Sequence, residues 1–491
     1  MLTQRDSDDG RRRAAQRRAT GYPRHAIQVI SVLLAGLCAG CSLAPREAPP
    51  TSALPAHWND PVLDSASLPP AADWWRQFGD PVLDGLVEQA LEHNLDLVLA
   101  AARIEEARAQ LGASRAEQMP SLDAQANASR QRSASTAGGG GQIRELYSVA
   151  GVLGYELDLF GRLRSATDAA HARLLESTYT TDALRLAVVT DVISAYLDLR
   201  ATERQLAITG ATVQSRQEAL RLERASLRLG SGTELTLRQA QAQLASALAQ
   251  AASLRDTLGR TQAALGVLTG ATPQALIEAL PPAGELSTLA LPGELPHVLP
   301  ADLLERRPDI RAAQAALRAA DADIGAARAL WFPRINLTAL IGSDALRVGD
   351  LFSGPAASWS LGSALVAPLL DFGRASAQVA GAQARRAQSE TLYRQTVQTA
   401  FREVRDALTT LREAQARERA QADAVAALTR ARELASLQYR DGRGRYLDVL
   451  DADRSLLSAQ LDQTAAARDA RVAAATLLKA LGGGWQAQAD S

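Results

Sequence analysis

The chain has 491 residues, more than one ordinary soluble core contains and enough for two or three domains. Its 53 basic and 54 acidic residues leave a formal net charge of -1, so the composition indicates no nucleic-acid partner. Aromatic residues make up only 4% of a chain that is 47% apolar. The apolar content is therefore mostly Ala and Leu, which is typical of long helices that pack closely.

The cysteines and histidines exclude the usual metal and redox chemistry. Both cysteines, Cys38 and Cys41, lie near the start of the chain, so we expect no disulfide and no thiolate metal site after them. The five histidines stand singly and never at ligand spacing. The sequence also has no Gly-rich phosphate loop with Lys and no nucleophile elbow. We expect no metal, no cofactor and no enzymatic activity.

The N-terminus has the pattern of an export signal. An excess of Arg precedes a short apolar run, Ala26–Cys38, which is too short to span a bilayer. We predict a signal peptide over residues 1–40. The sequence Leu37-Cys38-Ala39-Gly40-Cys41-Ser42 resembles a bacterial lipoprotein box, which makes Cys41 the predicted lipidation site. A plain secretory signal is the alternative. Residues 41–70, rich in Pro and Ala, are predicted to be a lipidated extended tether.

The rest of the chain is an internal duplication. Asp96 and Pro120 recur as Asp309 and Pro333, with the same interval of 24 residues. Each repeat is predicted to contain a helix, two strands, a very long helix, a turn and a second long helix. The predicted boundaries are 71–282 for the first repeat, 283–484 for the second and 485–491 for a C-terminal tail.

Long stretches without proline indicate the helical parts of the chain. No Pro occurs between Pro120 and Pro273, or after Pro368. An unbroken helix from Arg162 to Leu229 would be about 100 Å long, so it must pack along a partner helix as a coiled coil. The turns that reverse the two hairpins are predicted at paired glycines, Gly230 with Gly232 and Gly442 with Gly444.

Four segments alternate as strands with one apolar face. In the first repeat they follow Pro120 and run through Leu146–Asp158; in the second they follow Pro333 and return through Trp359–Leu365. Strands of this kind are typical of membrane barrels, but four strands cannot close a barrel, since about eight is the minimum. We therefore expect an α+β membrane protein whose barrel is shared between chains. The alternative is a soluble four-stranded cap on a coiled coil.

From Cys41 to Gly484, the chain resembles the TolC-like outer-membrane efflux proteins, specifically the NodT-type lipoproteins that serve resistance-nodulation-division (RND) pumps. The motifs that carry the resemblance are Trp74–Leu83, Asn94–Leu97, Arg307–Ile310, Asp371–Arg374 and Tyr446–Ala452. The resemblance implies a homotrimer with a twelve-stranded outer-membrane barrel and a twelve-helix periplasmic tube. It also implies export of drugs or small solutes, an N-terminal acyl anchor in the outer membrane, and two partners: a periplasmic adaptor (membrane fusion) protein and an inner-membrane RND pump.

The resemblance places the narrow end of the tube at the hairpin turns. Asp448 and Asp451 follow the second turn at a spacing of three, so they share one helix face. Three copies would form two stacked acidic rings that favour cations and raise one another's pKa. The alternative is an ordinary solvated helix face. Tyr439 is a candidate for a hydrogen bond to a neighbouring helix, and Leu447 a candidate apolar plug.

Arg443 and Arg445 are candidates for salt bridges at this constriction. The glycines of the turns, at 230, 232, 442 and 444, are candidate contacts for the adaptor, or simply turns. Two other functions stay open. One is the outer-membrane duct of a type I protein secretion system, and the other is a coiled-coil lipoprotein that spans the periplasm without a pore.

Overall fold

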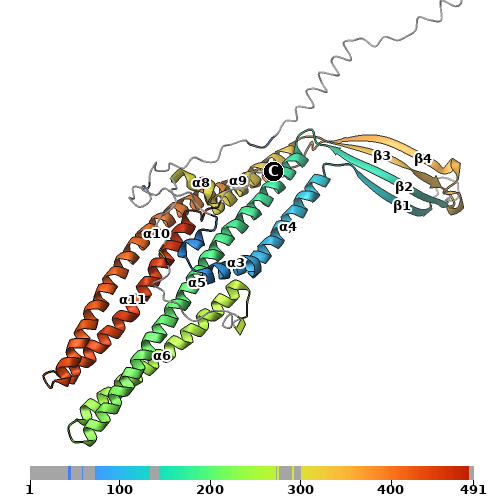
Figure 1. The fold of residues 1–491 in the computed structure, drawn as a ribbon. Helices are drawn as coiled ribbons and strands as arrows, with labels where there is room; N and C mark the ends of the chain where they lie inside the picture. The colour runs from blue at the N-terminus through green and yellow to red at the C-terminus, as the bar shows by residue number, and fades with distance from the viewer. Residues whose placement is uncertain are drawn as a thin grey trace, which may run out of the picture. The chain divides into compact units, whose positions relative to one another are not determined.

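The computed structural model describes residues 43–45, 58, 72–132, 143–272, 274–275, 290–291 and 300–485. The chain forms two compact units (Figure 1). The sheet unit contains residues 43–45, Ser114–Asp168 and Asp321–Ala382, and the helical unit contains the described parts of Glu47–Ala113, Ala169–Ala320 and Gln383–Ser491. Both halves of the sequence contribute to both units, so the compact units are not the two repeats. The signal peptide, Cys41 and the first strand turn lie outside the described residues.

The elements occur twice in nearly the same order. In the first half they are η1 (Trp74–Phe78), α3 (Pro81–His93), α4 (Leu95–Ala116), β1 (Ser121–Arg132), β2 (Ile143–Leu157), α5 (Arg162–Arg228) and α6 (Glu234–Thr269). In the second half they are η3 (Pro300–Asp302), α8 (Leu303–Arg306), α9 (Pro308–Arg328), η4 (Ala329–Trp331), β3 (Arg334–Ala345), η5 (Val348–Asp350), η6 (Gly354–Ala356), β4 (Ala357–Val366), α10 (Arg374–Arg440) and α11 (Tyr446–Ala480). The predicted order of elements is confirmed.

The two long helices begin in the same way. Asp158 accepts a hydrogen bond from the backbone N–H of Arg164 at 2.8 Å, and Asp371 accepts one from that of Ala375 at 2.9 Å. These carboxylates satisfy N–H groups that have no partner in the first turn of a helix. With no proline after the start, α5 and α10 both continue for 67 residues.

The four strands form one antiparallel sheet in the order β1-β2-β3-β4. The register pairs Leu122 with Leu153, Leu153 with Ala339, and Ala339 with Leu361. Because side chains alternate along a strand, these partners lie on one face, which confirms the predicted apolar face. The residues of this face on β4 are largely exposed: Trp359 is 79% exposed and Leu361 is 77% exposed.

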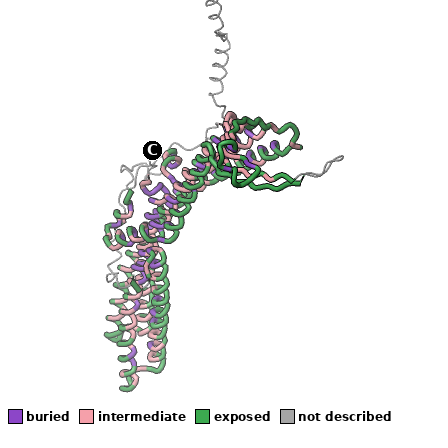
Figure 2. Tube along the Cα trace, turned by 90° about the vertical axis from the view of Figure 1, so that its right-hand side faces the viewer, coloured by how far each residue is buried: buried purple, intermediate pink, exposed green. Residues whose placement is uncertain are grey.

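The core of the helical unit is concentrated in one part of the long helices. Buried side chains from η1, α3, α5, α10 and α11 pack together there, and the largest fully buried ones include Trp74 and Phe78 on η1 and Tyr196 on α5. Toward the hairpin turns burial becomes rare (Figure 2). Between Ala414 and Ala459, a stretch that the structure describes completely, no residue is buried. Packing within one chain therefore stabilises this end weakly.

Equivalent positions of the two repeats tie the end of each hairpin to the helix that precedes the strands. The amide of Asn94 donates to the carbonyl oxygen of Leu268 at 2.9 Å, and its side-chain oxygen accepts from the backbone N–H of Asp96 at 3.0 Å. In the second repeat Arg307 donates to the carbonyl oxygen of Ala480 at 3.0 Å and pairs with Asp309 at 2.6 Å. Two different residue types thus make the same connection.

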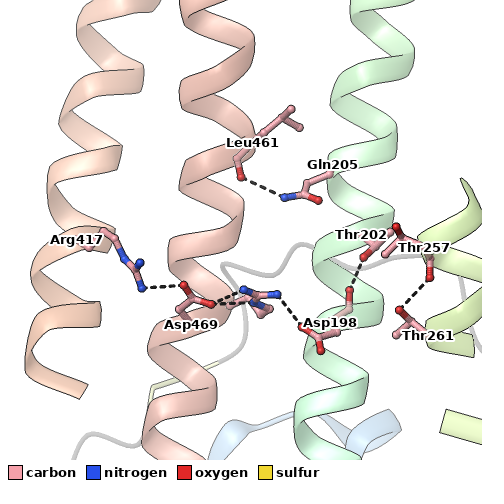
Figure 3. Close-up of polar contacts among 9 residues, drawn as sticks. Asp198, Thr202, Gln205, Thr257, Thr261, Arg417, Leu461 and Asp469 are labelled. Atoms are coloured by element: carbon pink, nitrogen blue, oxygen red, sulfur yellow. Dashed lines mark hydrogen bonds and ion pairs between the residues drawn. The ribbon is translucent and has the colours of Figure 1, made fainter. Parts of the chain in front are cut away.

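Charged side chains also connect the hairpins to each other (Figure 3). Arg468 on α11 bonds Asp198 on α5 at 2.9 Å, and Asp469 accepts from Arg417 on α10 at 2.7 Å. One row of ion pairs therefore spans three helices. The amide of Gln205 adds a hydrogen bond of 3.2 Å to the carbonyl oxygen of Leu461.

Candidate functional site

The two hairpin turns have the same backbone geometry, as the duplication predicts. Gly230 and Gly442 have φ angles of 75° and 72°, in the left-handed region that only glycine adopts without strain. The backbone N–H of Gly232 donates to Ser226 at 3.0 Å, and that of Gly444 donates to the equivalent Gln438 at 2.9 Å. The predicted turns are confirmed, whereas contact with an adaptor stays a prediction.

Two ion pairs follow the second turn, at the start of α11. Arg445 pairs with Asp448 at 3.1 Å, and Arg454 pairs with Asp451 at 2.6 Å. The four positions are three residues apart, and each step turns about 60° around the helix. Arg445 and Arg454 therefore lie on opposite sides, whereas the adjacent Asp448 and Asp451 share a face. Asp448 and Asp451 are 47% and 54% exposed and lie between the two arginines. In one protomer, each carboxylate of the candidate acidic rings thus has its own arginine partner.

Asp448 also caps the N-terminal end of α11. Its carboxylate accepts from the backbone N–H of Arg445 at 3.2 Å as well as from the Arg445 guanidinium. These hydrogen bonds, with the side-chain bond from Arg445 the larger effect, lower the pKa of Asp448. Acidic rings formed by three copies would raise the pKa of each carboxylate. This predicted increase would act against the lowering of the Asp448 pKa by Arg445.

Tyr439 reaches a neighbouring helix. Its hydroxyl donates to Oε1 of Glu223 on α5 at 3.2 Å, and its ring lies against Tyr446 with 5.4 Å between the ring centroids. Glu223 is only 8% exposed, so this hydroxyl is an important partner for its carboxylate. Burial raises the pKa of Tyr446 to about 12, so both tyrosines remain neutral donors at physiological pH. The contact joins the two hairpins near their turns.

The remaining candidates have simpler surroundings. Leu447 is 45% exposed at the start of α11, as an apolar plug would require. Arg443 pairs with Asp441 at 2.6 Å and not with the acidic pair on α11. Sequence analysis did not identify Glu223 or Arg454. Arg454 had a local signal, its spacing of three from Asp451, whereas Glu223 becomes adjacent to Tyr439 only when the two hairpins pack.

Two kinds of feature do not occur among the described residues. Over these ranges no group of three or more His, Cys, Asp or Glu side chains has metal-binding geometry. Within the same part of the chain, no helix combines the length and the apolar character needed to cross a membrane.

The fold belongs to a known class, that of outer-membrane channels. The structure matches the open state of the outer membrane channel MtrE of Neisseria gonorrhoeae with a TM-score of 0.81 and 32% identity, over 90% of this chain and 98% of that one. The family model for the outer membrane efflux protein matches residues 86–271 and 299–483, once in each half. The chain belongs to the outer membrane efflux protein family.

The similarity to individual relatives extends over almost the entire chain. It is 36% identical over 457 residues to the solvent efflux pump outer membrane protein SrpC of Pseudomonas putida, which covers 91% of this chain and 96% of SrpC. It is 31% identical over 471 residues to SilC of Salmonella typhimurium, described as a probable outer membrane lipoprotein, which covers 94% of this chain and 99% of SilC. The chain is an outer-membrane efflux protein.

Proposed function

We propose that three copies of this chain form the outer-membrane duct of a tripartite efflux system of the RND type, which carries drugs or small solutes out of the periplasm. The main support is the sheet, whose apolar face is exposed and whose outer strands β1 and β4 have no further strand partner among the described residues. Unpaired strand edges are not tolerated in a lipid bilayer, so the sheet must be completed by other copies.

Strand number and family membership both support three copies. Four strands per chain are too few for a barrel, and three chains give twelve, within the range of outer-membrane barrels. The weakly packed hairpin ends supply a second argument. In a trimer their exposed faces would pack against helices of adjacent chains and line one tube.

The turn region would form the constriction. Asp448 and Asp451 from three copies would line it, Leu447 would narrow it, and the bond between Tyr439 and Glu223 would hold it closed. The glycine turns would contact the periplasmic adaptor, which links the duct to an inner-membrane pump. Such a duct does no bond chemistry and needs no cofactor.

An acyl group on Cys41 would add an anchor in the same membrane. The support is the lipoprotein box and the similarity to SilC, described as a probable outer membrane lipoprotein. Two attachments, a barrel and a lipid, would keep the tube in a defined position in the membrane.

Single-channel recording tests the proposal. The detergent-extracted protein, added to a planar bilayer, should give discrete steps that favour cations. A silent bilayer, with a Tyr439→Phe variant also silent, would favour the spacer without a pore. Steps that appear only with a co-expressed secretion substrate would favour a type I secretion duct.

A further inference from the structure

The segment just after the predicted lipidation site contacts a built surface in the sheet unit. Leu43 and Ala44 begin two residues after Cys41. Nη1 of Arg328, at the end of α9, donates to the backbone carbonyl oxygen of Leu43 at 3.0 Å. Residues 43–45 are half-buried although they belong to a tether of extended character.

Gly325, one turn before Arg328, explains how the tether comes so close. A Cβ atom at this position would lie 2.9 Å from Cβ of Ala44 and 2.7 Å from Oγ of Ser165 on α5. Both distances are shorter than van der Waals contact, so a side chain here would displace the tether or the helix. Ser165 is itself buried. The small residues Gly325, Ser165 and Ala44 thus fit together where α9 and α5 meet.

The residues of this surface are close to the strands in sequence. Arg328 precedes β3 by six residues, and α5 begins five residues after the end of β2. The strand ends that join the helices are the periplasmic ends in the proposed function. A lipid attached two residues before Leu43 would therefore lie near the inner leaflet of the membrane that the strands cross.

We propose that Gly325, Arg328 and Ser165 form a seat for the Leu43–Ala44 segment, and that this seat fixes the lipid-bearing residue beside the strand ends. With the seat, about two residues or roughly 7 Å of chain separate Cys41 from a fixed point. Without it, the next described contact is Trp58 against Phe401, which leaves a free tether of up to about 60 Å. The role of the lipid rests on the proposed function, whereas the seat itself does not.

Disulfide cross-linking tests the seat in the full-length protein in its membrane. The pair Ala44→Cys with Gly325→Cys, in a Cys38→Leu background, places two Cβ atoms 2.9 Å apart, so a shift of about 1 Å gives the separation of roughly 3.8 Å that a disulfide needs. After reduction it should re-oxidise roughly tenfold faster than a control pair, Ala44→Cys with Ala326→Cys, because Ala326 points about 100° away around the helix. Trypsin and mass spectrometry identify the linked peptides. Equal rates for the two pairs would overturn the proposal.

A second measurement leaves Gly325 intact, in case its replacement disturbs the helices. The thiol of Ala44→Cys alone should react with a maleimide several-fold faster once Arg328→Ala removes the bond to Leu43. Arg318→Ala, an exposed arginine of the same helix, is the matched control. An unchanged rate with Arg328→Ala would contradict the seat. Labelling of the wild type and Cys41→Ala with a palmitate analogue reports lipidation separately, so failure of the anchor is distinguishable from failure of the seat.

Discussion

Asp448 illustrates how one side chain serves both structure and charge. It caps α11 through a backbone N–H and pairs with Arg445, while Asp451 one turn later pairs with Arg454. Exposed ion pairs of this kind contribute little to the free energy of unfolding. We therefore expect these charges to matter through the electrostatic potential around them. In a trimer, six carboxylates would lie in this region together with six arginines, and cation selectivity would require the carboxylates to lie closest to the axis.

The first prediction concerns the charges themselves. Asp448→Ala with Asp451→Ala should lower the selectivity for potassium over chloride several-fold, measured as the reversal potential in a salt gradient, because the acidic rings would be lost. Asp448→Asn with Asp451→Asn should do the same while keeping the cap of α11. Asp462→Ala, farther along the same helix, is the control. Unchanged selectivity in the Asn variant would assign both residues to an ordinary solvated face.

The pH dependence of selectivity follows from Arg445. Its hydrogen bonds lower the pKa of Asp448, so this carboxylate stays charged as the pH falls, until the pH passes the lowered pKa. We expect the selectivity to persist over the same range of pH. Arg445→Ala should raise the pKa and shift the loss of selectivity to higher pH. Arg443→Ala should leave the profile unchanged, since Arg443 pairs with Asp441. Identical profiles for wild type and Arg445→Ala would refute this account.

Tyr439 gives the third prediction. Tyr439→Phe removes the donor to a buried carboxylate, at a cost of about 1 kcal/mol to the closed arrangement, and should raise the open probability roughly fivefold. Tyr446→Phe keeps the ring against Tyr439 and that bond, and so serves as the control. Single-channel dwell times are the measurement. If both variants behave like wild type, the contact with Glu223 does not hold the channel closed.

At the scale of elements, two glycines should respond in opposite ways. Gly442→Ala places a side chain in a left-handed turn and should destabilise the hairpin by about 1 to 2 kcal/mol. Gly210 lies within α5, and a methyl group added there would meet no neighbouring side chain within 4 Å, so Gly210→Ala should stabilise by about 0.5 to 1 kcal/mol. Thermal unfolding followed by circular dichroism should therefore shift down for the first and up for the second. Shifts of the same sign would contradict the turn geometry.

The elements were predictable because their causes are local. Missing proline predicted the 67-residue helices, alternation predicted the apolar face of the sheet, and paired glycines predicted both turns. The contacts between elements were not predictable in the same way. Asn94 and Arg307 make the same connection with unrelated side chains, and Glu223 meets Tyr439 across 216 residues of sequence. Such pairs depend on how the hairpins pack, which no short pattern encodes.

At the scale of the whole molecule, one chain is incomplete in two places. The sheet exposes its apolar face and two strands that lack an outer partner among the described residues, and the end of the second hairpin contains no buried residue between Ala414 and Ala459. Each feature would be unfavourable in an isolated chain and would be resolved if further copies completed the barrel and the tube. Assembly is thus the central claim, and the constriction and its selectivity depend on it.

Native mass spectrometry of the detergent-extracted protein tests that claim most directly. We predict a single dominant species of three chains that persists on dilution, since strands and helices would be shared between neighbours. A protein that remains monomeric after extraction in several mild detergents, and that keeps the secondary structure described above, would contradict the shared barrel and the duct with it.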